Sequence, residues 1–226
     1  MTKRAARPAE TPVVDLDART TPSQSRARTT FEAVLSTAGE LLGEVGFERL
    51  STNLVCERAG MTPPALYRYF PNKYAILSEL ARRLMDAQDE AVFAWIQAGG
   101  LDAGSLEEAV DKNRRLQQQV NEITRGIPGG IWIMRALRAV PLLRDIRIAS
   151  RDKVARHISE RLTEAYPEVP ESELFRAARL TTEVAYAATE MVLEEPALDE
   201  ARINEDVCWM VAMHYQRLAQ RYAQGR

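Results

Sequence analysis

The chain has 226 residues, a net charge of −2 and 46% hydrophobic residues, which is enough to bury the core of one or two domains. No stretch approaches the ~18 consecutive apolar residues of a membrane span, and no apolar run follows the basic N-terminus as a secretory signal requires. Cys56 and Cys208 lack metal-ligand spacing and are typical of buried thiols in a reducing compartment. The sequence therefore predicts a soluble intracellular protein without a membrane partner.

Positive charge is concentrated around one short segment, residues 51–73, although the total charge is close to zero. Residues 1–28 carry six basic and three acidic side chains, a net +3. Residues 58–83 carry five basic side chains against Glu79 alone, a net +4. A local positive face on an acidic body favours a site-specific DNA-binding protein.

The beginning of the chain predicts an arm followed by three helices. Residues 1–25 mix Thr, Pro, Ser, Arg and Asp without periodicity, which is typical of a disordered arm. Apolar residues at helical spacing predict a helix from Phe31 that closes at Gly46. Two very short helices are then expected from their capping residues and terminators, namely Ser51 to Gly60 and Thr62, with Pro63 at the first helical position, to Phe70.

The rest of the chain is also helical in pattern, and strand alternation never extends beyond a few residues. Asn72 is the expected N-cap of a long helix, and Ser105-Leu-Glu-Glu108 is a capping box. The expected segments are 72–97, 105–123, 131–140, 142–166, 171–194 and 199–222. We therefore predict an all-α protein of about nine helices, with a three-helix N-terminal domain and a larger helical domain after it.

Residues 28–77 resemble the N-terminal DNA-binding domain of the TetR family of bacterial transcriptional regulators. The residues that carry the resemblance are Ala38, Gly46-Phe47, Ser51, Val55, Ala59-Gly60, Leu66-Tyr67, Phe70, Lys73 and Leu77. After the disordered arm at 1–25, it implies a helix-turn-helix domain at 26–72 and an effector-binding and dimerisation domain at 73–226. It also implies a bacterial cytoplasmic repressor that a small molecule releases from a palindromic operator, without a cofactor.

In a helix-turn-helix the second helix enters the major groove of DNA. Near bases we therefore expect Pro63, Pro64, Ala65, Arg68 and Tyr69, with Arg68 able to bond a guanine edge. Near phosphates we expect Ser51, Thr52, Tyr67 and Lys73, while Asn53 could contact either and Arg28 precedes the first helix. The family usually has a small residue where Pro64 stands and a hydroxyl where Ala65 stands, so base reading should depend more on Tyr67, Arg68 and Tyr69.

The last two predicted helices are apolar on more than one face, which indicates burial on more than one face. Their main stripes consist of Ala178, Thr181, Ala185, Ala188 and Val192 in one helix, and of Val207, Met210, Val211, His214 and Leu218 in the other. We expect these stripes to form the interface of a homodimer, as the resemblance also implies.

The middle helices are expected to enclose a largely apolar small-molecule effector. Candidate lining residues and polar anchors are Trp95, Trp132, Met134, Arg135, His157, Phe175, Glu183, Tyr186 and Glu190. Aromatic and Met side chains at this spacing are also common in a plain core. No metal site is expected, because His157 and His214 lack carboxylates at ligand spacing.

Two other classes of protein remain as alternatives. An all-α enzyme is disfavoured by the absence of a Gly-rich phosphate loop, a His-Glu-x-x-His pair and a nucleophile with its base. An architectural DNA-binding protein is disfavoured because shape-only binding needs a broad basic surface.

Overall fold

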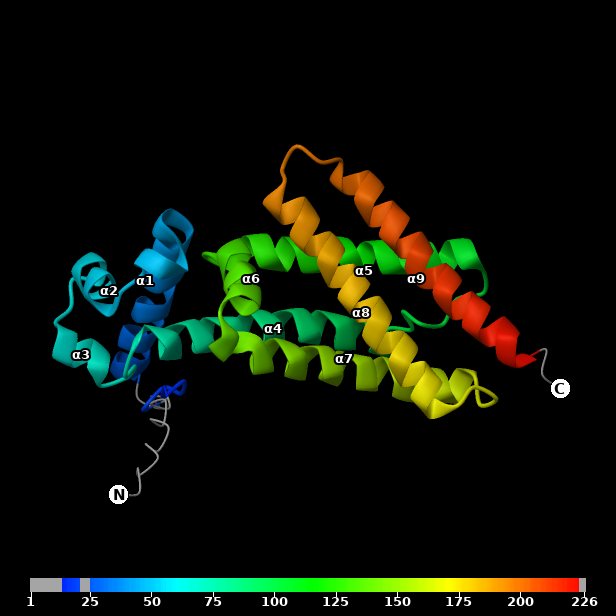
Figure 1. Ribbon diagram of the computed structural model, residues 1–226, viewed down its shortest axis with the longest axis horizontal. Helices are drawn as coiled ribbons and strands as arrows, with labels where there is room; N and C mark the ends of the chain where they lie inside the picture. The colour runs from blue at the N-terminus through cyan, green and yellow to red at the C-terminus, as the bar shows by residue number, and fades with distance from the viewer. Residues whose placement is uncertain (1–13, 21–24, 224–226) are drawn as a thin grey trace, which may run out of the picture.

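The computed structural model describes residues 14–20 and 25–223, and its regular structure there is entirely helical (Figure 1). The predicted all-α fold is confirmed, with nine α-helices and one 3-10 turn in these ranges. Their bounds are α1 Ser25–Arg49, α2 Thr52–Ala59, α3 Pro63–Tyr67, α4 Lys73–Gln97, α5 Leu106–Gly126, α6 Gly130–Ala139, η1 Pro141–Leu143, α7 Arg144–Ala165, α8 Glu171–Glu194 and α9 Glu200–Ala223.

Side-chain caps fix several helix starts. The Ser51 hydroxyl accepts a hydrogen bond from the Leu54 amide at 3.2 Å, and the Ser105 hydroxyl accepts one from the Glu108 amide at 3.1 Å. The side-chain oxygen of Asn72 accepts from the amides of Tyr74 and Ala75. Thr62 makes no such side-chain bond, so α3 starts on the fixed φ of Pro63 instead.

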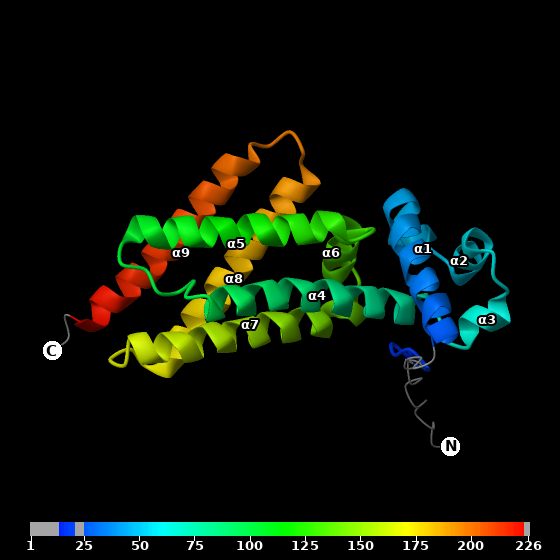
Figure 2. The same ribbon diagram turned by 180° about the vertical axis from the view of Figure 1, so that it is seen from behind.

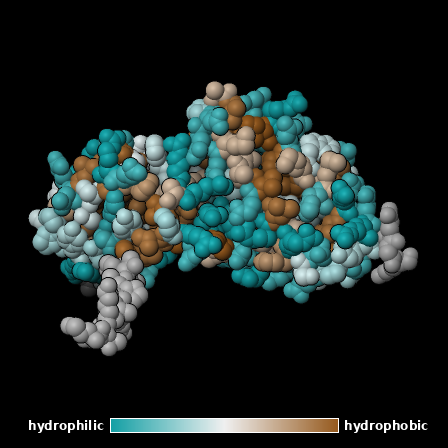
Figure 3. Space-filling model, viewed as in Figure 1, coloured by the Kyte–Doolittle hydropathy of each residue, from teal (hydrophilic) through white to brown (hydrophobic). Residues whose placement is uncertain are grey.

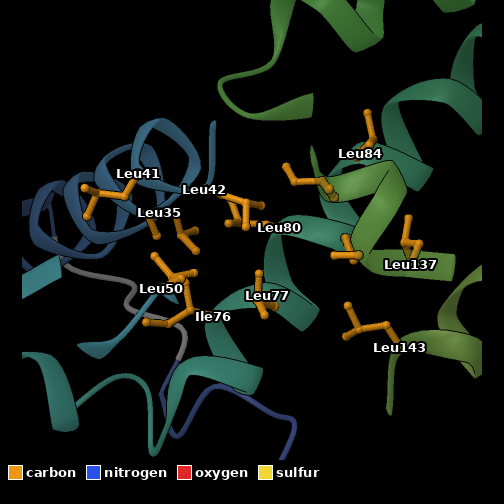
Figure 4. Packing of buried hydrophobic residues seen from close by; sticks show 14 of the residues in the cluster. Leu35, Leu41, Leu42, Leu50, Ile76, Leu77, Leu80, Leu84, Leu137 and Leu143 are labelled. Atoms are coloured by element: carbon orange, nitrogen blue, oxygen red, sulfur yellow. The ribbon is translucent and has the colours of Figure 1, made fainter. Parts of the chain in front are cut away.

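The first three helices share one apolar core with the start of α4. Leu35, Leu41 and Leu42 of α1 belong to one buried cluster with Ile76 and Leu77 of α4, part of which Figure 4 shows, and all five side chains are almost completely buried. Each such side chain contributes roughly 1.5–3 kcal/mol when buried. Because α2 and α3 are too short to be stable alone, their positions depend on this shared core.

Helix α4 joins the N-terminal helices to the rest of the molecule. It leaves the N-terminal core and runs into the body, where it packs against α5, α6 and α7 (Figure 1, Figure 2). Helices α8 and α9 cover the body on one side, with α8 packed along α7 and α9 along α5. Within the described residues, no helix is long and apolar enough to cross a membrane.

The N-terminal boundary differs from the prediction. Helix α1 begins at Ser25, so Arg26 and Arg28 lie in its first turn and do not precede it. Gly46 interrupts the helix with φ 72° and ψ 168°, and one more helical turn continues to Arg49. Of the arm predicted at 1–25, residues 1–13 and 21–24 lie outside the described residues, whereas residues 14–20 are hydrogen-bonded to the N-terminal domain.

Candidate functional sites

A tight turn fixes the angle between α2 and α3. Gly60 has φ 63° and ψ 33°, a left-handed conformation that glycine adopts without strain. Its amide donates to the Glu57 carbonyl, and the Met61 amide donates to the Cys56 carbonyl at 3.0 Å. Leu66 is fully buried and anchors α3, so the opposite face of that short helix is presented outward.

The outward face of α3 carries the chemistry expected for DNA contact. Pro63, Pro64 and Arg68 are exposed, as is Asn53 at the start of α2. The Tyr67 hydroxyl lies 3.0 Å from the Thr52 hydroxyl oxygen and so ties α3 to α2. Among the described residues no carboxylate forms an ion pair with Arg68. Its guanidinium is therefore available for a phosphate or a base edge.

Two residues predicted to contact DNA instead face the protein. Tyr69 is 5% exposed and its ring lies edge-on to Phe31, with centroids 5.9 Å apart. The Lys73 ammonium donates hydrogen bonds to the carbonyl oxygens of Phe47 and Glu48, both at 3.1 Å. These carbonyls lie in the last turn of α1, where backbone acceptors have no partner within the helix. Tyr69 is thus a core residue in this structure, and Lys73 stabilises a helix end.

Residues 14–20 lie along the end of α3 and the start of α4, a contact that the sequence did not predict. The Arg19 amide donates to the Tyr69 carbonyl at 2.8 Å, and its guanidinium donates to the Tyr67 carbonyl at 3.1 Å. Asp17 forms an ion pair with Arg82 at 2.6 Å, and the Asn72 side chain donates to the Asp15 carbonyl. The segment has no periodicity or cap that could have revealed these contacts.

The body contains a cavity of about 80 Å³ between α4, α5, α7, α8 and α9. Its walls are mostly apolar, and of the nine predicted effector residues it brings together Trp95 and Tyr186. Sequence reasoning missed most of the other lining residues, because Val, Leu and Thr at helical spacing carry no signal that separates a cavity from a core. The lining residues that were not predicted include Val92, Val120, Val154, Thr182, Thr189 and Tyr215.

The other seven predicted effector residues do not line this cavity, and six of them lie in α6 or α8. Arg135 lies over the Trp132 ring and pairs with Glu194 at 2.9 Å. Met134 is buried in the core, Glu190 pairs with Arg138, and Glu183 pairs with Arg179. Phe175 of α8 lies close to Arg156, and the seventh residue, His157 of α7, stacks on Phe93.

A buried arginine lies behind the cavity wall. Arg151 is 2% exposed, and its guanidinium carbon lies 3.0 Å from the centre of the Tyr186 ring. The nearest carboxylate contact, to Glu183, is 4.0 Å long. Burial lowers the pKa of Arg151 and raises the pKa of Asp89 nearby, whose oxygen accepts a hydrogen bond from Ser150 at 2.7 Å.

Helices α8 and α9 expose only part of the residue set predicted as the dimer interface. Six of the predicted residues are buried inside the protomer, namely Ala178, Thr181, Ala188, Val192, Val207 and Leu218. The exposed large apolar residues of these helices are Leu180, Met191, Met210 and Met213. Of the predicted set, Met210 is exposed, while Ala185, Val211 and His214 are partly exposed. Figure 3 shows brown apolar surface on this side of the molecule.

Comparison with known proteins supports both the N-terminal domain and the fold. Residues 34–80 match the family of bacterial regulatory proteins, tetR family. Over 54 residues the chain is 50% identical to the class C tetracycline repressor protein of Escherichia coli, covering 24% of this chain and 25% of that protein. The class A repressor from transposon 1721 is 44% identical over 52 residues. The matches thus span about a quarter of the length of these relatives.

Solved structures resemble the chain over most of its length. A TetR-family transcriptional regulator from Streptomyces coelicolor has a TM-score of 0.57 and 23% identity, covering 84% of this chain and 99% of that one. The SmeT–triclosan complex has a TM-score of 0.59 and 17% identity, with coverages of 82% and 90%. At these identities the likeness concerns the fold. Among the described residues, no group of His, Cys, Asp and Glu is arranged to hold a metal ion.

Proposed function

We propose that this chain, which belongs to the TetR family of bacterial regulatory proteins, is a dimeric repressor that a small molecule releases from operator DNA. The outward face of α3 and of Arg68, the residue directly after it, carries the proposal, because it presents exposed Pro63, Pro64 and Arg68 beside the Gly60 turn. In this proposal the domain at 26–72 binds DNA, and the domain at 73–226 binds the effector and the second subunit.

Within the DNA-binding face, the proposed roles follow exposure and chemistry. Arg68 reads a guanine edge, and the rings of Pro63 and Pro64 contact thymine methyl groups. Thr52, Asn53 and the Ser51 hydroxyl hold phosphates, together with Arg28 in the first turn of α1. Tyr67 orients this face through its bond to Thr52.

The proposed homodimer places two copies of α3 on one palindrome. The apolar side chains that support it are Leu180 and Met191 of α8 and Met210 and Met213 of α9, because each is about half exposed in the single chain. A two-fold interface through this face is self-complementary, and it presents two recognition helices to two half-sites.

The cavity supports a proposed effector site, because it lies against α4, the helix that reaches the DNA-binding core. SmeT, which shares the fold, is known as a complex with triclosan. An effector that favours a conformer with a different spacing of the two α3 helices weakens operator binding, and operator DNA then weakens effector binding by the same factor.

A gel-shift assay with promoter DNA from beside the gene tests the DNA-binding role. Arg68→Ala should weaken the specific complex by roughly 5- to 150-fold, the ~1–3 kcal/mol of a bidentate base contact. Arg115→Ala, which removes an exposed arginine from α5, is the matched control and should leave the complex unchanged. Specific binding that survives Arg68→Ala unchanged contradicts the assignment of this face.

Footprinting separates this proposal from the architectural alternative. A site-specific dimer protects one palindrome, whereas a shape-only binder protects DNA continuously. The enzyme alternative has no support from the comparisons, because the family that matches consists of transcriptional regulators.

A further inference from the structure

The end of the short helix α3 is held by a residue that lies far away in the sequence. Helix α3 ends at Tyr67 and Arg68 follows it, so the carbonyl groups of Tyr67 and Tyr69 lie beyond the last acceptor of the helix. The Arg19 guanidinium donates to the Tyr67 carbonyl at 3.1 Å, and the Arg19 amide donates to the Tyr69 carbonyl at 2.8 Å. Arg19 therefore holds the backbone on both sides of Arg68.

Two further contacts support the segment that carries Arg19. The Asn72 side chain donates to the Asp15 carbonyl at 2.9 Å, and Asp17 forms an ion pair with Arg82 at 2.6 Å. Asn72 is the N-cap of α4, and Arg82 lies further along the same helix. Residues 14–20 are thus bound to α4 as well as to the end of α3, and α4 belongs to the apolar core of the N-terminal helices.

Helix α3 needs such support because it has only five residues. A helix of this length is not stable alone, and its start lacks a side-chain cap at Thr62. At its end, the Arg68 amide donates to the Pro64 carbonyl at 3.2 Å. Leu66 anchors the buried side, so the direction of the exposed Arg68 side chain depends on the bonds that flank it.

We infer that Arg19 is a positioning residue for base reading, because it fixes the backbone from which the Arg68 guanidinium reaches a base edge. A bidentate contact with a base requires a defined geometry. Loosening the backbone at Arg68 therefore weakens the specific complex, whereas phosphate contacts made by other residues remain. The inference rests on the proposed function in one respect, namely that Arg68 reads a base.

Hydrogen exchange of the full chain without DNA tests the positioning itself. Arg19→Ala removes the guanidinium bond from an exposed side chain. The amides of Arg68 and Tyr69 should then exchange about three- to tenfold faster, while the melting temperature falls by no more than about 4 °C. Arg115→Ala on the exposed side of α5 is the control and should leave exchange in α3 unchanged. Unchanged exchange in Arg19→Ala overturns the inference.

Gel shifts with operator DNA and with unrelated DNA separate positioning from direct contact. Arg19→Ala should weaken the operator complex by about three- to tenfold. It should leave both the complex with unrelated DNA and the salt dependence of operator binding unchanged. A direct phosphate contact by Arg19 would instead weaken both complexes equally and lower the slope of log affinity against log salt by about one. That result overturns the inference.

An Arg68→Ala background identifies the side chain through which Arg19 acts. In that background Arg19→Ala should weaken operator binding by less than about twofold, because the side chain that it positions is gone. A full additional loss would show that Arg19 acts independently of Arg68, which contradicts the inference. If exchange responds as expected but the wild-type protein forms no specific operator complex, the proposed regulator is wrong and the positioning of α3 by Arg19 stands.

Discussion

Gly39 of α1 and Gly129 before α6 meet backbone to backbone: a Cβ built on Gly129 would lie 2.2 Å from the carbonyl oxygen of Gly39. In the reverse direction, a Cβ on Gly39 would lie 2.5 Å from the carbonyl oxygen of Pro128. Gly129 also has φ 72°, which favours glycine. The N-terminal core and the body are thus in direct contact through this pair as well as through α4.

Gly39→Ala should destabilise the protein by roughly 1–3 kcal/mol, because the added methyl group forces α6 away from α1. Gly43→Ala is the matched control on the same helix. Its Cβ would lie 3.8 Å from the Trp132 ring, an ordinary contact, so it should gain up to about 1 kcal/mol of helix propensity. Urea unfolding of both variants measures the difference, and equal stabilities would show that the contact can relax.

Met210→Glu should convert the proposed dimer into monomers. Met210 is 57% exposed in the single chain, so the variant should fold normally, whereas a carboxylate buried without a partner in the dimer should weaken association by ~100-fold or more. Sedimentation equilibrium measures the mass. Gln118→Glu on the exposed side of α5 is the control, and an unchanged mass for Met210→Glu would exclude this face.

Lys73→Met should lower stability by about 1–2 kcal/mol, because charge-assisted hydrogen bonds to the Phe47 and Glu48 carbonyls are lost. The apolar stem is retained, so the change isolates the ammonium group. Thermal unfolding checks the magnitude, and gel shifts check DNA binding. If stability is unchanged while nonspecific and specific DNA complexes weaken equally, Lys73 is a phosphate contact as the sequence predicted.

Glu32→Gln should destabilise the protein at pH 7 but not in acid. Hydrogen bonding and charge from the Arg83 guanidinium lower the pKa of Glu32 below its usual 4.5. The ion pair is therefore present above that value and is lost as pH falls through the folded-state pKa. Both side chains are over a third exposed, so the contribution at pH 7 is only about 0.5 kcal/mol.

Unfolding of Glu32→Gln and wild type at pH 7 and pH 3.5 tests this dependence. The difference in free energy of unfolding between wild type and Glu32→Gln should also shrink at high salt, because salt screens the ion pair. Glu57→Gln, on the exposed side of α2, is the control for removing a negative charge. If the difference in free energy of unfolding between wild type and Glu32→Gln grows in acid, the ion pair with Arg83 is not the interaction that stabilises the protein through Glu32.

Local signals in the sequence determined the helices and the helix-turn-helix. Ser51, Gly60, Pro63 and Asn72 mark starts and ends because capping bonds and backbone preferences involve only neighbouring residues. Their spacing also identified the family, since it fixes the angle between α2 and α3. The exposure of Arg68 follows from the same short helix, in which Leu66 takes the buried side.

Only the tertiary structure decided which side chains of the longer elements face inward. Helices α8 and α9 are apolar on two faces, so periodicity could not tell the stripe that packs inside the protomer from the exposed one that includes Met210. The inward turn of Tyr69 and Lys73 and the contacts of residues 14–20 likewise depend on partners distant in sequence. Such contacts form only when the whole chain packs, and no local pattern encodes them.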